Sequence, residues 1–209
     1  MPNAAPFNTL EVIKRTSNHT EAKNILIIGV FHGEEPQGEY IINRYLENGN
    51  LSDTKNHLFF IPCLNPWGKE RGVRVNQNGV DLNRNYPTKN WIETERDENY
   101  SGSHAASEIT TRQMVKLLND LKPDIILTLH APLKCVNYDG PAKELAEKIA
   151  EFCNYPVVAD LGYPTPGSFG TYCGIERNIP TITLEYDDQE DYESIYMKTE
   201  KAFDWLAVY

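Results

Sequence analysis

Short apolar runs alternate along the chain with segments whose apolar residues recur at helical spacing. The apolar runs, typical of buried strands, are Ile25–Phe31, His57–Leu64, Asp124–Leu129, Val157–Leu161 and Thr181–Leu184. The helical spacing is found at Pro36–Gly49, Ser107–Leu121, Ala142–Phe152 and Tyr192–Val208. Strands that alternate with helices predict parallel crossover units. We therefore expect a single α/β domain over residues 1–209, with a mixed, largely parallel central sheet and helices on both faces.

Three stretches lie outside this pattern. Residues 1–23 are polar and are expected to add an edge strand and a turn. Residues 67–100 are rich in Asn, Gly and Arg and lack clear periodicity, and a second loop is expected at residues 162–174. A long structureless segment inside a compact domain is usually functional, so residues 67–100 are a place to look for a binding site.

The net charge of the chain argues against some classes of binding partner. Asp and Glu number 30 against 20 Lys and Arg, a formal net charge of −10. Nucleic acids and anionic membranes favour a basic surface, so neither is an expected partner. The N-terminus does not resemble a secretory signal, no apolar run approaches membrane-spanning length, and four scattered cysteines form no CxxC pair. We expect a cytoplasmic protein, and the oligomeric state stays open, a homodimer included.

Polar residues follow three of the apolar runs at the point where each run ends. His32 and Glu35 follow the first, His130 the third and Glu185 the last. In an open α/β sheet, ligands bind outside the carboxyl ends of the strands. Two His and one Glu form a known catalytic zinc set with one coordination position left for water. Glu185 could then act as the general base that takes a proton from this water.

Each of these residues also has an ordinary structural interpretation. A His followed three residues later by a Glu often arises by chance, and Glu34 could replace Glu35 as a ligand. His130 alone fits a hydrogen-bonded core histidine, and Glu185 fits a helix cap or a surface acid. The metal site is favoured because all four positions agree with the fold rule. The remaining histidines, His19, His57 and His104, are interpreted as structural or solvated.

The segment RGVRVNQNGVDLNRNYP (residues 71–87) suggests a second kind of chemistry. It places Arg71, Arg74 and Arg84 among several asparagines in an otherwise acidic protein. Guanidinium groups bind carboxylates in bidentate fashion and stabilise a developing oxyanion. On composition alone, a surface loop whose arginines form weak exposed ion pairs ranks slightly ahead.

Five motifs together resemble the zinc carboxypeptidase family. They are HGEE (32–35), NPWG (65–68), RVNQNGVDLNRNYP (74–87), LTLHAP (127–132) and TLE (183–185), in the order of that family. Within the family, the chain is most similar to the small cytoplasmic murein peptide amidases. That similarity rests on RVNQNGVDLNRNYP, on the HAPL turn and on GYPTPGSFGTYC (162–173).

The resemblance implies a zinc carboxypeptidase-like fold and a role for each motif residue. One zinc ion would be held by His32, Glu35 and His130. Glu185 would be the general base, and Arg74 would polarise the scissile carbonyl and share the charge of the tetrahedral intermediate.

The resemblance also implies the substrate, a short peptide with a free C-terminal carboxylate. Asn83 and Arg84 would hold this carboxylate. For the amidase group, the bond cleaved is γ-D-glutamyl to meso-diaminopimelate in murein tripeptide, during cell-wall peptide recycling. The loop from Thr165 to Tyr172, with Ser168, is expected to recognise the distal end of the leaving residue. Tyr172 is also a candidate for the mobile tyrosine that digestive members place over the substrate.

Three other functions are weighed against this one. Two are enzymes on the same scaffold: a general metallocarboxypeptidase, or an N-acyl amino acid deacylase like succinylglutamate desuccinylase and aspartoacylase. The third is a metal-free module that binds a peptide terminus. The complete DLNRN run (residues 81–85) favours a peptidase over a deacylase, and the intact ligand set with its base speaks against a metal-free module.

Overall fold

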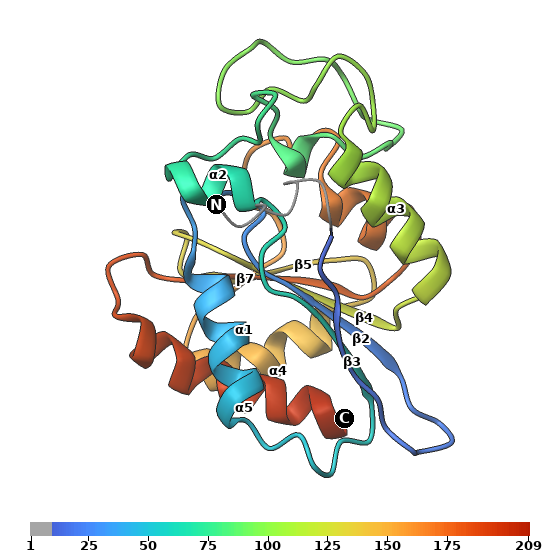
Figure 1. The fold of residues 1–209 in the computed structure, drawn as a ribbon, viewed down its shortest axis with the longest axis vertical. Coiled ribbons are helices and arrows are strands. Elements are labelled where there is room, and N and C mark those ends of the chain that lie inside the picture. The colour runs from blue at the N-terminus through green and yellow to red at the C-terminus, as the bar shows by residue number, and fades with distance from the viewer. Residues whose placement is uncertain (1–9) are drawn as a thin grey trace, which may run out of the picture.

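The strands form one seven-stranded sheet in the order β1-β3-β2-β4-β7-β5-β6 (Figure 1). The computed structural model describes residues 10–209. The strands are β1 (Ile13–Arg15), β2 (Asn24–Ile28), β3 (His57–Ile61), β4 (Ile125–His130), β5 (Cys135–Asp139), β6 (Val157–Val158) and β7 (Thr181–Glu185). Neighbours run parallel except in the pairs β1–β3 and β5–β7. The mixed, largely parallel sheet confirms the expected fold class.

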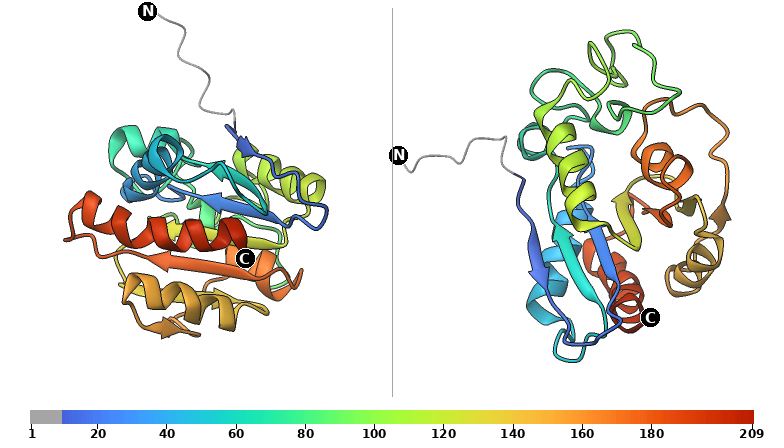
Figure 2. Two further views of the ribbon diagram at one scale, coloured as in Figure 1. Left: turned by 90° about the horizontal axis from the view of Figure 1, so that it is seen from below. Right: turned by 90° about the vertical axis from the view of Figure 1, so that its right-hand side faces the viewer.

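Helices cover both faces of this sheet (Figures 1 and 2). The α-helices are α1 (Gln37–Asn48), α2 (Pro66–Arg71), α3 (Ile109–Leu121), α4 (Lys143–Cys153) and α5 (Tyr192–Val208). A 3₁₀-helix, η1 (Leu82–Arg84), and a π-helical turn, η2 (Thr171–Ile175), lie in the connecting segments. Helices α1, α4 and α5 pack on one face, and α3 and η2 pack on the other. No helix in residues 10–209 has the length and apolar character needed to cross a membrane.

The two faces of the sheet carry separate cores because side chains alternate along a strand. In β2, Ile25 and Ile27 belong to the core under α1, α4 and α5, while Leu26 and Ile28 belong to the core under α3. All four side chains are fully buried. This explains why β2 reads as a continuous apolar run instead of an alternating one.

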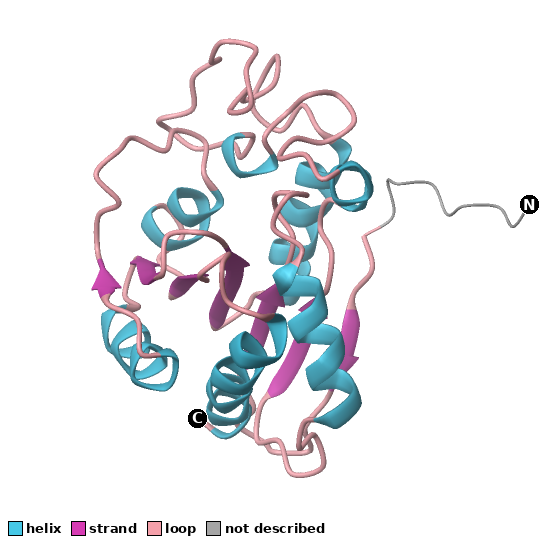
Figure 3. Cartoon of the chain, turned by 90° about the vertical axis from the view of Figure 1, so that its left-hand side faces the viewer, coloured by secondary structure: helices cyan, strands magenta, loops and turns pink. Residues whose placement is uncertain are grey.

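The long connection between α2 and α3 lies over one end of the sheet, where loops gather (Figure 3). It is joined to the turn that follows β2, because the Gly33 backbone N–H donates to the Arg74 carbonyl at 3.4 Å. The polar segment identified in the sequence is therefore held at the carboxyl end of the sheet. That is where an open α/β sheet binds its ligands.

Several boundaries differ from the sequence expectation. Strands β2 and β3 end at Ile28 and Ile61, before the ends of their apolar runs, and Val30 adopts φ 52°, outside the β region. Strand β6 has two residues only. Strand β5 and helix α2 were not expected, and η2 lies partly within the expected loop at residues 162–174. The edge strand expected within residues 1–23 is β1, and residues 1–9 lie outside the described part of the chain.

Candidate metal centre and substrate cleft

The turn after β2 is built so that its backbone lies close to α2. A Cβ added to Gly33 would lie 2.0 Å from the Gly68 carbonyl carbon, so no larger residue fits between the two backbones. Asn65 caps α2 by accepting from the Gly68 N–H at 3.0 Å, and its own amide donates to the Arg74 carbonyl at 3.1 Å. This arrangement fixes the turn that carries His32.

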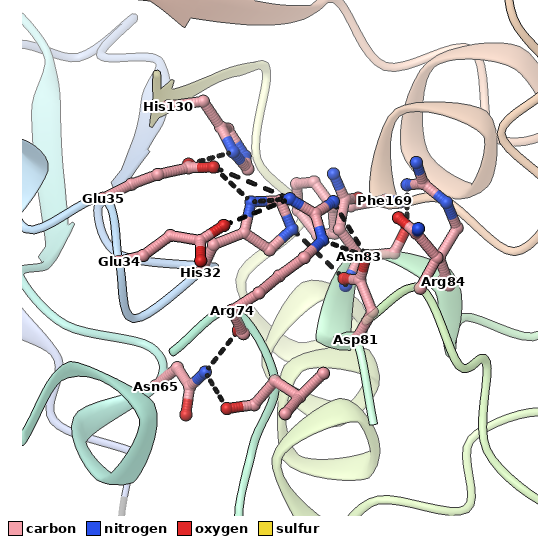
Figure 4. Close-up of polar contacts among 12 residues, drawn as sticks. His32, Glu34, Glu35, Asn65, Arg74, Asp81, Asn83, Arg84, His130 and Phe169 are labelled. Carbon is pink, nitrogen blue, oxygen red and sulfur yellow. Dashed lines mark hydrogen bonds and ion pairs between the residues drawn. The ribbon is translucent and has the colours of Figure 1, made fainter. Parts of the chain in front are cut away.

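His32, Glu35 and His130 come together in one buried cluster (Figure 4). Glu35 Oε1 lies 2.7 Å from His32 Nδ1, and its Oε2 lies 2.9 Å from His130 Nδ1. The three side chains offer one ligand atom each within 4.8 Å of one another. They are 3 to 6% exposed. Glu34, weighed as the alternative to Glu35, is instead exposed.

Asp81 orients the first of these histidines. Its carboxylate, fully buried, lies with Oδ1 3.1 Å from His32 Nε2, which leaves Nδ1 facing Glu35. A carboxylate on the far nitrogen of a metal-binding histidine fixes the tautomer and raises the basicity of the ligand. Sequence reasoning gave Asp81 no role, although it stands in the DLNRN run.

The charges of the cluster stabilise one another. Burial alone would lower the pKa of His32, but the carboxylates of Asp81 and Glu35 outweigh it and raise this pKa to about 9. Burial opposes ionisation of Glu35 as well, yet the two histidines lower its pKa to about 2. Two imidazole nitrogens and a carboxylate gathered in this way fit the ligand set of a catalytic zinc ion, which takes three protein ligands.

Glu185 lies beside this cluster at the end of β7. Its register partner across the sheet is His130, the last residue of β4. The side chain is 7% exposed and lines the same cavity as the three candidate ligands. Burial raises the pKa of the Glu185 carboxyl above its ordinary value. A buried carboxylate with a raised pKa is suited to accept and return a proton.

Arg74 is held in place by Asp81 and directed at the cluster (Figure 4). Its Nε and Nη2 atoms lie 3.0 and 2.9 Å from Asp81 Oδ2. Its remaining nitrogen, Nη1, lies 3.8 Å from Glu35 Oε1 and 3.9 Å from Glu34 Oε1. One carboxylate, that of Asp81, therefore positions both a candidate ligand and a candidate oxyanion donor.

Arg84 and Asn83 line the cleft next to the cluster. The Asn83 side-chain oxygen accepts from the Phe169 N–H at 2.9 Å, and its backbone carbonyl accepts from Arg84 Nη1 at 2.9 Å. Arg84 is 8% exposed, and within residues 10–209 no carboxylate lies within ion-pair distance of its guanidinium. Most of its donors are left for a ligand.

The loop residues selected from the sequence lie in different places. Ser168 lines the cleft, and its hydroxyl donates to Thr171 Oγ1 at 2.9 Å. Tyr172 is not among the residues that line the cleft, because its ring stacks on Tyr86 and its hydroxyl accepts from Arg177 at 2.9 Å. Tyr163, which the sequence did not single out, lines the cleft and is 48% exposed.

Comparison with known proteins shows the family of this chain. Residues 6–145 match the zinc carboxypeptidase family, and the chain belongs to that family. It is therefore a zinc-dependent hydrolase of the peptidase class.

Within the zinc carboxypeptidase family, the chain is similar to proteins named as murein peptide amidases. Murein peptide amidase A of Escherichia coli K12 is 34% identical over 173 residues, 77% of this chain and 70% of that protein. The protein of the same name from Vibrio campbellii is 35% identical, over 77% of this chain and 68% of its own length. A crystal structure of murein-tripeptide amidase from Escherichia coli O157 superposes with a TM-score of 0.80 at 31% identity, covering 90% of this chain and 83% of that one.

Replacing Asp81 with asparagine is expected to weaken zinc binding about 10- to 100-fold, because an amide holds the His32 ring less firmly and no longer enhances its basicity. Competition with a chromophoric chelator measures this affinity. Asp53→Asn, the same change at an exposed position, should leave it unaltered. Equal zinc affinity in Asp81→Asn and the wild-type protein would contradict the orienting role of Asp81.

Proposed function

We propose that this protein binds one zinc ion through His32, Glu35 and His130 and hydrolyses the C-terminal amide bond of a short peptide. The bond is that between γ-D-glutamate and meso-diaminopimelate in murein tripeptide, cleaved in cell-wall peptide recycling. Names and identities of the relatives support the substrate: two curated proteins of 34 to 35% identity are murein peptide amidases. The chemistry of the site supports the reaction.

The observation that carries the proposal is the position of Arg84. Its guanidinium has no carboxylate partner within the described part of the chain, and it lines the same cleft as the cluster of His32, Glu35 and His130. A guanidinium with free donors binds a carboxylate in bidentate geometry. A peptide whose terminal carboxylate is held there would place its last amide bond near the cluster, which restricts cleavage to the C-terminal residue.

Each of the other site residues has a role in the proposed hydrolysis. Bound zinc supplies Lewis acid chemistry at the scissile carbonyl. The Glu185 carboxylate accepts a proton from the attacking water and passes it to the leaving amine. Arg74 directs Nη1 toward the cluster, where it can donate to the carbonyl oxygen as negative charge develops. Asn83 is fixed by Phe169 and helps to seat the terminal carboxylate.

An assay of the purified zinc-loaded protein on three substrates tests the proposal. We expect diaminopimelate to be released from murein tripeptide at least ten times more efficiently, in kcat/KM, than the products of a hippuryl amino acid or an N-acetyl amino acid. Faster cleavage of the hippuryl substrate would indicate a general carboxypeptidase, and faster cleavage of the N-acetyl substrate a deacylase. Less than about one zinc per chain without any hydrolysis would indicate a peptide-binding module.

A further inference from the structure

The face of the sheet that carries the cluster continues as a polar wall below it. Side chains alternate across a strand, and Val136 of β5 belongs to the core on the opposite face. Cys135, Asn137 and Asp139 are therefore on the face of Glu185. Asn137 and Asp139 both line the cleft that holds the candidate metal ligands. Strand β5 thus carries polar side chains down one side of the cleft.

The pairing of β5 with β7 gives the depth of this wall. Cys135 pairs with Glu185, and Asp139 pairs with Thr181, four residues further from the reacting end of β7. At about 3.3 Å per residue, the backbone at Asp139 lies roughly 13 Å from the row of Glu185. This depth leaves room between the row of Glu185 and Asp139 for a long side chain of a leaving residue.

The middle of the wall is polar but already hydrogen-bonded. Thr128 Oγ1 donates to Thr183 Oγ1 at 3.1 Å or to the Ile182 carbonyl at 3.3 Å. Asn137 donates from its amide to the Val158 carbonyl at 2.8 Å. Thr128, Thr183 and Asn137 all line the cleft.

Asp139 differs from these neighbours in its lack of a polar partner among the described residues. In residues 10–209 no hydrogen bond or ion pair reaches the Asp139 side chain. Two glycines in and next to η2 pack closely against it: a Cβ on Gly170 would lie 2.1 Å from Asp139 Oδ2, and one on Gly174 would lie 2.3 Å from Asp139 Cβ, so a side chain at either position would collide with Asp139. Burial raises the pKa of this carboxyl, and within residues 10–209 no cationic side chain offsets the effect.

We infer that Asp139 binds a cationic group at the far end of the leaving residue's side chain. The inference rests on the proposed function and deepens it. The cleft would then recognise both ends of an amino acid that carries an additional ammonium group: Arg84 would hold its α-carboxylate, and Asp139 its distal ammonium. Meso-diaminopimelate carries such an ammonium, and so does lysine. Asp139 is on this basis a specificity-determining residue that takes no part in proton transfer.

Paired substrates and one isosteric variant test this inference. The substrates are two L-Ala-γ-D-Glu peptides, one ending in lysine and one in norleucine, which differ only in the distal ammonium. We expect the wild-type protein to prefer lysine at least tenfold in kcat/KM. In Asp139→Asn, kcat/KM for the lysine peptide should fall about 10- to 100-fold, mainly through KM, because a charge-assisted hydrogen bond is lost. The norleucine peptide should change less than twofold.

The control is Asp53→Asn, which removes the same charge at an exposed site outside the cleft and should retain the wild-type preference. Zinc content and thermal unfolding of Asp139→Asn are measured alongside. Equal losses on both peptides, or no loss on either, would overturn the inference. A wild-type protein that shows no preference for lysine would do so even if the variant failed to fold.

Failure of the proposed function gives a different result. Wild-type protein that hydrolyses a hippuryl or N-acetyl amino acid, but neither γ-glutamyl peptide nor murein tripeptide, would reject the amidase itself. Wild-type protein that releases diaminopimelate from murein tripeptide, without distinguishing lysine from norleucine, would retain the amidase and reject the role of Asp139.

Discussion

Replacing Glu185 with glutamine is expected to lower kcat about 10³-fold while zinc remains bound. Glutamine preserves the size of the side chain but cannot take a proton from water, and positioned general bases contribute about 10²- to 10⁴-fold. Glu185 lines the cleft without belonging to the cluster of candidate ligands, so the metal should be unaffected. Zinc per chain and kcat on murein tripeptide, measured on the same preparation, check both parts.

Glu147→Gln is the matched control, because Glu147 is exposed on α4 and should retain full activity. The pH profile provides a second readout. Since burial raises the pKa of Glu185, its carboxylate is lost as pH falls through that pKa, and the wild-type kcat/KM should fall on the acid side. In Glu185→Gln, this fall in kcat/KM at acid pH should be absent. If Glu185→Gln retained more than about a tenth of wild-type kcat, another group would have to be the base.

The candidate ligands could be found from the sequence because their positions follow from strand ends. His32, His130 and Glu185 each stand directly after an apolar run, and parallel strands bring such residues to one edge of the sheet. Glu35 could be preferred over Glu34 only through the resemblance, and the structure supplies a physical difference, since Glu35 is buried and Glu34 exposed.

Other parts of the site were hidden because their patterns are short or their partners distant. Strand β5 reads CVNYD, in which the residues facing the cleft are polar, so it lacks the apolar run that marked the other strands. Helix α2 has six residues, too few to show a periodicity. Asp81 acts on His32, 49 residues away, and no local spacing predicts that contact.

The direction of the Tyr172 side chain could not be predicted from the sequence. The sequence placed Tyr172 in a loop that could cover the site, but its local position did not reveal which way the ring points. In the structure this ring packs on Tyr86, next to the core under α3, and Tyr163 takes a place in the cleft. Side-chain direction in an irregular loop depends on tertiary packing, which neither propensity nor motif spacing specifies.

Replacing His130 with alanine is expected to abolish both zinc binding and hydrolysis. It removes one of three candidate ligands and leaves Glu35 Oε2 without the imidazole 2.9 Å away. The loss of zinc affinity should exceed the roughly 10- to 100-fold typical of residues that only orient a ligand. His104→Ala is the control, because that side chain is exposed and outside the cluster.

Thermal unfolding with and without zinc separates loss of the metal site from loss of the fold. A metal that binds only the folded protein raises its stability by about 4 kcal/mol at a concentration 1,000 times its Kd. Wild-type protein and His104→Ala should therefore unfold at a higher temperature when zinc is added, and His130→Ala should not. The His130 ring also stacks on Phe31, so its removal costs packing energy as well. Comparing the unfolding temperatures of the wild-type protein and His130→Ala without zinc measures that loss. A full zinc-induced shift in His130→Ala would remove His130 from the proposed ligand set.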